Sequence, residues 1–477
     1  MIFKNLQLKN FKSHVNTTID FQPGISVIVG ENGAGKSTIF EAIDFIRTKR
    51  TSDEVITQTE LEGDGFVSVE IEVRGDDLEA LVETDALKKY KSYLIDTDGV
   101  KSLRIMRSSE ETKITQAKKE KTLSIVNVRV FNSATNQFEN PTGIDNTIAA
   151  LFDAQFVWAD TNSGDIADFS KTKICGKIIN TIISNNVSES WDNFKKSHKE
   201  TFEIIADNLK PVEEQIQGKL SEQYGDTVVK FNFTLPEITD FLKSGNIVLS
   251  DNGIQTTSSE KGTGMQRALA LSLIQVYADI SSNGKEDTSK PIMFFIDEPE
   301  TFLHPQAQNK LLDSLEKISE KSQVFIITHS PYLLKKYKKE THSLNVFSKN
   351  SAFNIIEESA SFDLFGASSP TWGEINYYAF GVISIEFHNE LYGFVQAKAI
   401  VDDEKYNFEN DFEQYLASKG VAQDKTYVRL KKDGTTENQT RTLPTLIRNV
   451  IHHPENTNNS FSESDLKASI EALLALL

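Results

Sequence analysis

Two acidic residues, Asp297 and Glu298, directly follow five apolar residues at 292–296. A short unbroken apolar run bounded by charge is typical of a buried parallel strand. Carboxylates at its C-terminal end would lie where open α/β folds bind their ligands. Asp297 could hold Mg²⁺ through its oxygens, and Glu298 could orient or deprotonate an attacking water. The pair therefore predicts a hydrolytic Mg²⁺ site, unless the strand simply ends in a charged turn.

A glycine-rich segment near the N-terminus predicts a phosphate-binding loop. GENGAGKST, residues 30–38, follows the expected strand GISVIVG and precedes a helix expected from about Ile39. It matches G-x-x-x-x-G-K-[ST] in the context that this pattern requires. Backbone N–H groups would wrap phosphates, Lys36 would reach the β- and γ-phosphates, and Ser37 would complete the Mg²⁺ shell opposite Asp297. The predicted nucleotide-binding residues here are Gly30, Asn32, Gly33, Gly35, Lys36, Ser37 and Thr38.

Two other segments could complete this site. A second buried strand, residues 323–328, ends at His329, whose ring could hydrogen-bond a γ-phosphate or the attacking water. Gly262, Thr263 and Gly264 introduce a helix, and small residues with a hydroxyl at a helix N-terminus form an anion site. Thr and Gly are also common at ordinary helix caps. The order of the segments along the chain favours the functional interpretation.

Composition limits the class of protein. The 477 residues suffice for two or three domains, with apolar (38%) and charged (25%) shares typical of a globular protein. The net charge of −18 argues against a broadly basic nucleic-acid surface. No apolar run approaches the roughly 20 residues of a membrane span, and MIFKNLQLKN is not a signal peptide. With Cys175 as its one cysteine, we expect a cytoplasmic chain without a disulfide framework or membrane contact.

The elements that must position these residues predict an α/β head over residues 1–350. Three strands fill residues 1–30, and alternating apolar residues from Phe66 predict an antiparallel β layer. Residues 150–225 show helical spacing and predict a helical insertion, which Pro211 should kink or restart.

The remaining residues, 351–477, predict a separate, mainly α-helical domain for effector or docking functions. Within it, Arg448 and His453 could cut RNA, since a His can move the 2′-hydroxyl proton while an Arg holds the phosphate. Pro454 should turn His453 off the helix and leave His452 on the face of Arg448. The alternative is a helix C-terminus with basic residues near its carbonyls.

Taken in order, these motifs resemble those of the ABC-type ATPases of the SMC, RecF and OLD (overcoming lysogenisation defect) group. The resemblance implies that residues 30–38 are Walker A and residues 292–298 Walker B, with Asp297 on Mg²⁺ and Glu298 as catalytic glutamate. GTGMQ, residues 262–266, takes the place of the signature motif. The further residues to which the resemblance gives a role are Thr263, Gly264 and Gln266 of the signature, residues 300–305 of the D-loop, the switch histidine His329, and Gln155 as the Q-loop glutamine.

The resemblance also implies an assembly. In such ATPases the signature of one subunit caps the ATP held by Walker A of another, so that two ATPs are buried in a homodimer or a higher homo-oligomer. Thr263 would then donate to a γ-phosphate in trans. The chain departs from the group in lacking a zinc hook and a long coiled coil. The TOPRIM nuclease domain of OLD proteins has only a weak counterpart in residues 402–404, which we interpret as an acidic surface loop.

The segment Arg448–His453 is similar to the R-x(4–6)-H motif of HEPN ribonucleases, in which paired chains cut RNA without metal. The whole chain resembles compact ATPases of bacterial anti-phage defence operons, such as the Septu, retron-associated and anticodon-nuclease-linked families. One hypothesis is an ATPase sensor that controls its own HEPN-like domain. The others are a scaffold that regulates a separate effector protein, and a RecF-like DNA-repair ATPase, so that either RNA or DNA is a candidate partner.

Overall fold

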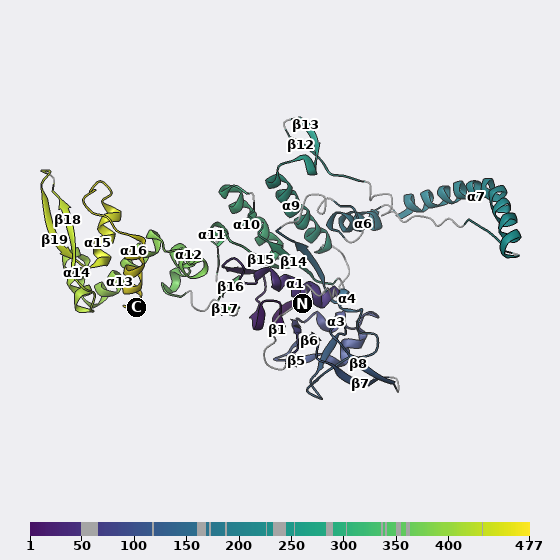
Figure 1. The fold of residues 1–477 in the computed structure, drawn as a ribbon, viewed down its shortest axis with the longest axis horizontal. Coiled ribbons are helices and arrows are strands. Elements are labelled where there is room, and N and C mark those ends of the chain that lie inside the picture. Colours follow the sequence, from purple (N-terminus) through teal and green to yellow (C-terminus); the bar gives the residue numbers. More distant parts are fainter. Residues whose placement is uncertain are drawn as a thin grey trace. The chain divides into compact units, whose positions relative to one another are not determined.

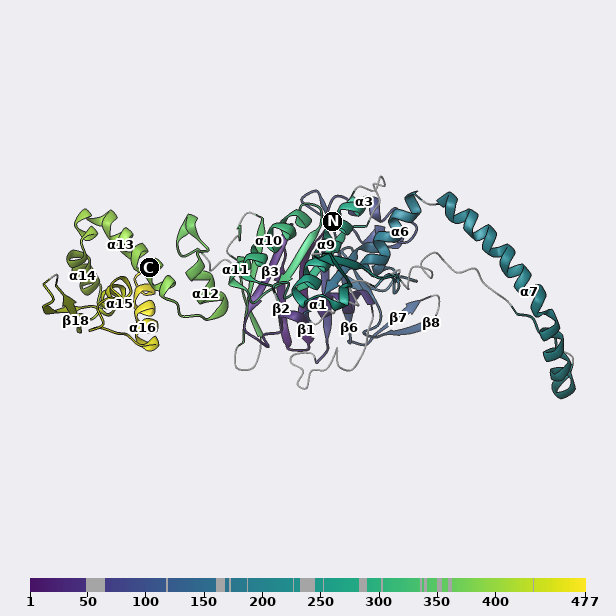
Figure 2. The same cartoon turned by 90° about the horizontal axis from the view of Figure 1, so that it is seen from above.

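The computed structural model shows two compact units, which are described separately. The first unit contains Met1–Phe156, Met293–Glu300 and Gln323–Leu477, and the second contains Val157–Ile292 and Thr301–Ser322. The structure describes residues 1–48, 65–116, 119–159, 168–170, 173–186, 188–225, 227–231, 245–251, 253–282, 290–301, 303–334, 337–338, 341–349, 354–358, 363–431 and 433–477. Figures 1 and 2 show the elements in two views.

The predicted antiparallel layer is a seven-stranded sheet of the first unit. Its order is β10-β9-β6-β4-β1-β2, with β5 paired to β6. Alternate residues of β4 and β6 are buried, as the alternating sequence predicts. The strands are β1 (Ile2–Phe11), β2 (His14–Asp20), β4 (Ser68–Arg74), β5 (Ile95–Thr97), β6 (Val100–Ser108), β9 (Arg129–Asn132) and β10 (Gln137–Glu139). A separate hairpin joins β7 (Thr112–Gln116) to β8 (Lys119–Leu123).

A second, six-stranded sheet carries the predicted site. Its order is β11-β14-β15-β3-β16-β17, in which β14, β15, β3 and β16 run parallel and β17 pairs antiparallel with β16. These strands are β3 (Ile25–Gly30), β11 (Asp153–Val157), β14 (Ile292–Asp297), β15 (Gln323–Ile327), β16 (His342–Lys349) and β17 (Asn354–Glu358). The predicted domain boundary at residue 350 falls in the connection between β16 and β17, so the sheet extends past it.

An aromatic core joins the two sheets. Phe295 of β14 stacks on Phe325 of β15 with ring centroids 4.6 Å apart, and on Phe156 of β11 at 4.8 Å. Phe3 of β1 meets both Phe295 and Phe325 edge to face. Because these rings are fully or largely buried, they fix the antiparallel layer against the sheet that carries the phosphate loop.

Short helices complete the first unit's head. The helix α1 (Lys36–Thr48) follows the phosphate loop and buries Ile39, Phe40, Ile43 and Ile46 on one side. The others are α3 (Leu78–Leu81), the 3₁₀ helix η1 (Lys88–Tyr93), α4 (Ile148–Leu151) and α11 (Pro331–Leu334).

The second unit is mainly helical, as predicted for the insertion, but the insertion begins later than expected. Residues 153–157, which we expected to be helical, form strand β11, because both of its faces are buried. The helical elements are α6 (Ile174–Asn186), α7 (Ser188–Tyr224), η2 (Ser258–Glu260), α9 (Thr263–Ser282) and α10 (Pro305–Ser319), and β12 (Val248–Asp251) pairs with β13 (Ile254–Thr257). α7 continues through Pro211, so the expected restart does not occur.

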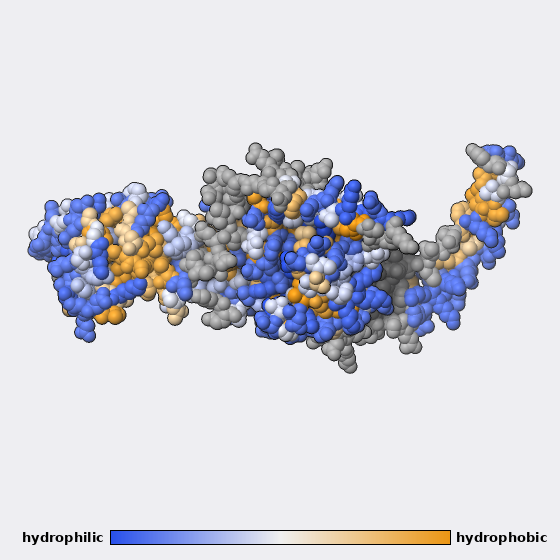
Figure 3. Space-filling view, turned by 90° about the horizontal axis from the view of Figure 1, so that it is seen from below, coloured by the Kyte–Doolittle hydropathy of each residue, from blue (hydrophilic) through white to orange (hydrophobic). Residues whose placement is uncertain are grey.

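The surface of α7 carries apolar side chains, which gather along the helix in the space-filling view (Figure 3). The exposed ones are Phe194, Ile204, Ile205, Val212 and Ile216. The helix is therefore amphipathic.

The C-terminal residues form a mainly helical region with its own core, as predicted. Its core includes Phe387, Leu391, Phe412, Ile447 and Ile470. The helices are η4 (Gly366–Ser368), α12 (Trp372–Phe380), α13 (Ile385–Asp402), η5 (Glu404–Asn407), α14 (Glu409–Ser418), α15 (Leu443–His452) and α16 (Glu463–Leu474). The hairpin of β18 (Lys425–Leu430) and β19 (Thr436–Arg441) was not predicted, because its second strand, TENQTR, lacks apolar alternation.

Candidate nucleotide-binding site

A cavity of about 330 Å³ lies at the C-terminal edge of the six-stranded sheet. Because β14, β15 and β3 are parallel neighbours, the segments that follow them meet at this edge. The lining residues are Ser13, Asn32, Gly33, Gly35, Lys36, Ser37, Thr38, Glu298, Ile327 and His329. The structure thus brings together the predicted phosphate loop, the residue after Asp297, and the histidine that follows β15.

Backbone conformation explains the glycines of the loop. Gly30 has φ +135°, and a Cβ there would lie 2.0 Å from the carbonyl oxygen of Phe347 in β16. Gly33 and Gly35 have φ +76° and +81°, in the region that favours glycine. The loop can therefore expose its N–H groups only if these positions carry no side chain.

A buried histidine that the sequence analysis missed hydrogen-bonds to the backbone of the phosphate loop. His14 of β2 is fully buried, with Nε2 3.0 Å from the carbonyl oxygen of Gly35 and Nδ1 2.9 Å from Oγ1 of Thr17. Burial lowers the pKa of His14, so the ring is neutral at pH 7. The carbonyl can only accept, so Nε2 carries the proton and Nδ1 accepts from the Thr17 hydroxyl. A single histidine in a strand gives no sequence signal for this role.

Lys36 is folded onto the loop itself. Its Nζ donates to the carbonyl oxygens of Gly30 at 3.0 Å and Glu31 at 2.7 Å. Burial lowers the pKa of Lys36, while the nearby carboxylates of Asp297 and Glu298 oppose that shift. The ammonium group is thus held at the cavity, where a phosphate could take the place of these carbonyl partners.

The hydroxyl of Ser37 and the carboxylate of Asp297 meet, although they are 260 residues apart in sequence. Ser37 Oγ donates to Asp297 Oδ2 at 2.9 Å, and Asp297 is 4% exposed. A hydroxyl and a carboxylate oxygen at this separation are both hard oxygen ligands, and they fit a shared Mg²⁺ ion beside the phosphate loop.

Glu298 and His329 face each other at the cavity. Glu298 has φ +46°, which is uncommon for a residue other than glycine and often marks a functional site. Its carboxylate Oε1 lies 3.8 Å from Nε2 of His329. Burial lowers the pKa of His329, as does the charge of Lys36, while Glu298 raises it. A neutral imidazole results, which can donate through one nitrogen and accept through the other.

The predicted signature residues lie in the second unit. Thr263 begins α9 and is exposed, Gly264 lies in its first turn, and Gln266 donates through Nε2 to the carbonyl oxygen of Lys261 at 2.7 Å. The buried Arg267 donates to the carbonyl oxygen of Trp158 at 3.1 Å. The exposed helix N-terminus is therefore anchored by the two residues that follow Met265.

The two remaining predicted segments are the Q-loop glutamine Gln155 and the D-loop. Gln155 lies in β11, buried, where Nε2 donates to Asp153 Oδ1 at 2.8 Å, and it does not line the cavity described above. In the predicted D-loop at 300–305, residue 302 lies outside the described residues, and His304 caps α10 by accepting from the N–H of Gln306.

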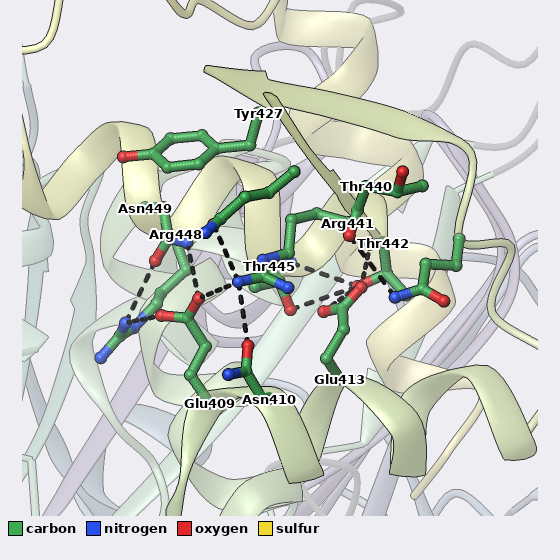
Figure 4. A network of polar contacts seen from close by, with 12 residues as sticks. Glu409, Asn410, Glu413, Tyr427, Thr440, Arg441, Thr442, Thr445, Arg448 and Asn449 are labelled. Atoms are coloured by element: carbon green, nitrogen blue, oxygen red, sulfur yellow. Dashed lines mark hydrogen bonds and ion pairs between the residues drawn. The ribbon is translucent and has the colours of Figure 1, made fainter. Parts of the chain in front are cut away.

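Arg448 of α15 belongs to an internal network of the C-terminal region (Figure 4). Its Nη1 donates to Glu409 Oε2 at 3.2 Å, while Asn449 Nδ2 donates to Oε1 of the same carboxylate at 3.1 Å. Arg441 lies 3.3 Å from Glu409 as well. The Nη1 group of Arg448 is thus already occupied by a carboxylate of the same chain.

His453 leaves the helix as Pro454 predicts. α15 ends at His452, and His453 has ψ +63° with its exposed ring 3.1 Å from Glu455 Oε1. The acidic residues at 402–404 lie where α13 meets η5, and Asp403 pairs there with Lys405. Among the residues that the structure describes, no group of three or more His, Cys, Asp or Glu is arranged to hold a metal ion.

The fold and cavity define a P-loop ATPase head. Residues 1–334 match the model of the AAA ATPase domain, and the chain belongs to that family. It is 29% identical to the Old nuclease of Escherichia phage P2 over 348 residues, which cover 69% of this chain and 56% of the relative. The chain thus spans just over half the length of that protein.

The chain is also similar to two other proteins. The Rad50 ATPase of DNA double-strand break repair from Methanocaldococcus jannaschii is 41% identical over 90 residues, 18% of this chain and 9% of that protein. A solved SMC head bound to the C-winged helix domain of ScpA has 17% identity and a TM-score of 0.43, covering 76% of this chain and 99% of that one. The sequence matches make this chain an ATPase of the SMC, RecF and OLD type. No helix in the described ranges is long and apolar enough to cross a membrane.

The geometry of Gly30 gives a first prediction. Gly30→Ala should weaken ATP binding by about fivefold to 150-fold, because relieving the contact with the Phe347 carbonyl and the strained φ costs about 1–3 kcal/mol. Titration with a fluorescent ATP analogue measures the change. The control is Gly393→Ala in α13, where a Cβ meets nothing within 4 Å and binding should be unchanged. Wild-type affinity in Gly30→Ala would contradict the geometry.

Proposed function

We propose that this ATPase is a switch that closes as a homodimer around two ATPs and controls an effector in bacterial anti-phage defence. The observation that supports the pairing is the N-terminus of α9, where Thr263 is exposed although its helix is anchored through Arg267. A hydroxyl and free N–H groups at a helix N-terminus suit a γ-phosphate held by a second chain.

Each residue at the cavity has a definite task in this proposal. Lys36 would hold the β- and γ-phosphates, and Ser37 and Asp297 would hold Mg²⁺, which neutralises phosphate charge when bound. Glu298 would orient and deprotonate the attacking water, since its carboxylate opens into the cavity. Neutral His329 would hydrogen-bond the γ-phosphate or that water.

ATP would drive the pairing by mass action. A ligand that binds the closed dimer and not the separate heads shifts the population toward the dimer, and hydrolysis reverses the shift. The rate of ATP hydrolysis would thereby set how long the dimer persists, and with it the activity of the C-terminal region or of a partner protein.

The defence role is supported by resemblance and by the match to a phage nuclease. Because the chain spans only 56% of that relative, nuclease activity does not transfer with the match. The alternative is a scaffold that binds a separate toxin or nuclease through residues 363–477. A RecF-like DNA-repair ATPase remains a third proposal, favoured by the Rad50 match and opposed by the charge of −18.

Mixing two inactive variants tests the shared site. Lys36→Ala removes phosphate binding, and Thr263→Arg blocks the signature. If sites are shared, each mixed dimer holds one intact site, and a 1:1 mixture should recover about a quarter of wild-type ATPase activity, since about half of the dimers are mixed. Steady-state phosphate release measures the recovery.

The matched control mixes Lys36→Ala with Glu298→Gln. Both changes lie in one chain's half of the site, so each site in a mixed dimer keeps one defect and activity should stay absent. Recovery in the control, or none in the test mixture, would contradict pairing through Thr263.

An RNase activity of the C-terminal region is a second candidate. It is favoured by the departure of exposed His453 from the helix that carries Arg448. We expect the double variant Arg448→Ala, His453→Ala to lose RNA cleavage and toxicity while ATP hydrolysis persists, because only the phosphate contact and proton transfer are removed. The control is exposed Arg429→Ala in β18. Equal cleavage by all three proteins would contradict the proposed role of Arg448 and His453.

A further inference from the structure

Glu300 lies two residues beyond Glu298 and reaches across to the next strand. Its Oε1 accepts a hydrogen bond from the backbone N–H of His329 at 2.8 Å. The neighbouring bond runs the other way, since the N–H of Glu298 donates to the carbonyl oxygen of Ile327 at 2.8 Å. These two bonds tie the segment after β14 to the segment after β15 directly behind the cavity.

The carboxylate of Glu300 is placed at an electrostatic cost. Its second oxygen, Oε2, is buried and has no hydrogen-bond partner within the described part of the chain. Burial raises the pKa of Glu300, and hydrogen bonding from its own N–H, from His329 and from Thr328 opposes that shift. A buried carboxyl group that is only half satisfied destabilises a fold, so it calls for a role other than stability.

The bond from His329 identifies that role. His329 is the first residue that lines the cavity after β15, and its ring faces Glu298 at 3.8 Å. This bond fixes the backbone of His329, and therefore the position of its side chain, relative to the segment that follows β14 and contains Glu298. His329 lies between the end of β15 at Ile327 and the start of α11 at Pro331, so its backbone N–H bonds to Glu300 and not within a strand or helix.

We propose that Glu300 is a positioning residue for ATP hydrolysis, which holds His329 at the reacting phosphate by accepting its backbone N–H. The inference rests on the role proposed above for His329. Glu300 is not itself among the residues that line the cavity, and it acts through its hydrogen bond to the histidine.

Two variants of similar size separate positioning from packing. Glu300→Gln keeps an oxygen that can accept the N–H, whereas Glu300→Met fills the same space without an acceptor. We expect Glu300→Met to lower kcat about tenfold with KM within about twofold, and Glu300→Gln to stay within about threefold of wild type. Steady-state ATPase assays measure both constants.

A double-mutant cycle with His329→Ala completes the test. If Glu300 acts through the histidine, Glu300→Met should slow the His329→Ala enzyme by less than about twofold more. The same loss in both backgrounds, or an equal loss in the Gln and Met variants, would overturn the inference. If His329→Ala lowers kcat and Glu300→Met does not, the inference about Glu300 is overturned while the role of His329 stands. A His329→Ala enzyme with wild-type kcat would overturn the role of His329 as well.

Discussion

The parallel pairing of β15 with both β14 and β3 is the constraint on which the site depends. This pairing brings the phosphate loop close to Asp297 and Glu298. Ser37 of the loop donates a hydrogen bond to Asp297, which lies 260 residues later in the sequence. The stacked rings of Phe295 and Phe325 hold these strands face to face with the antiparallel layer. A substitution in this aromatic core would therefore displace the strands that carry the nucleotide-binding residues, since packed cores transmit displacement.

The cavity holds one cationic side chain close to two carboxylates. Lys36 is bonded to carbonyl oxygens, and His329 is neutral because burial and Lys36 lower its pKa. Asp297 and Glu298 lie opposite, so the site presents cationic and acidic halves. ATP with Mg²⁺ would join the two halves, because its phosphates suit Lys36 and its metal suits Asp297.

The sequence predicted those parts of the fold in which apolar residues recur at a regular spacing or a strict motif occurs. The antiparallel layer and the two buried strands that precede Glu298 and His329 were confirmed, because each shows unbroken or alternating apolar residues with a fixed terminus. The phosphate loop, Glu298 and His329 lie together at one cavity, and their roles stay predictions. Gln155 was assigned to a helical region, yet its segment is strand β11, since a run of five residues, four of them buried, is too short to distinguish the two periods. His14 gave no signal, and Glu300 was predicted only as part of the D-loop, because their contacts are with backbone atoms that only the tertiary fold brings near. The roles of Thr263, Arg448 and His453 stay predictions.

The central claim is that ATP binding, not hydrolysis, pairs two heads. Glu298→Gln isolates that step, since it removes the carboxylate that would activate water and leaves Lys36, Ser37 and Asp297 in place. The mass of this variant in solution, by light scattering during gel filtration, should be that of a dimer with ATP and Mg²⁺ and that of a monomer with ADP and Mg²⁺. The same mass with both nucleotides would contradict the claim.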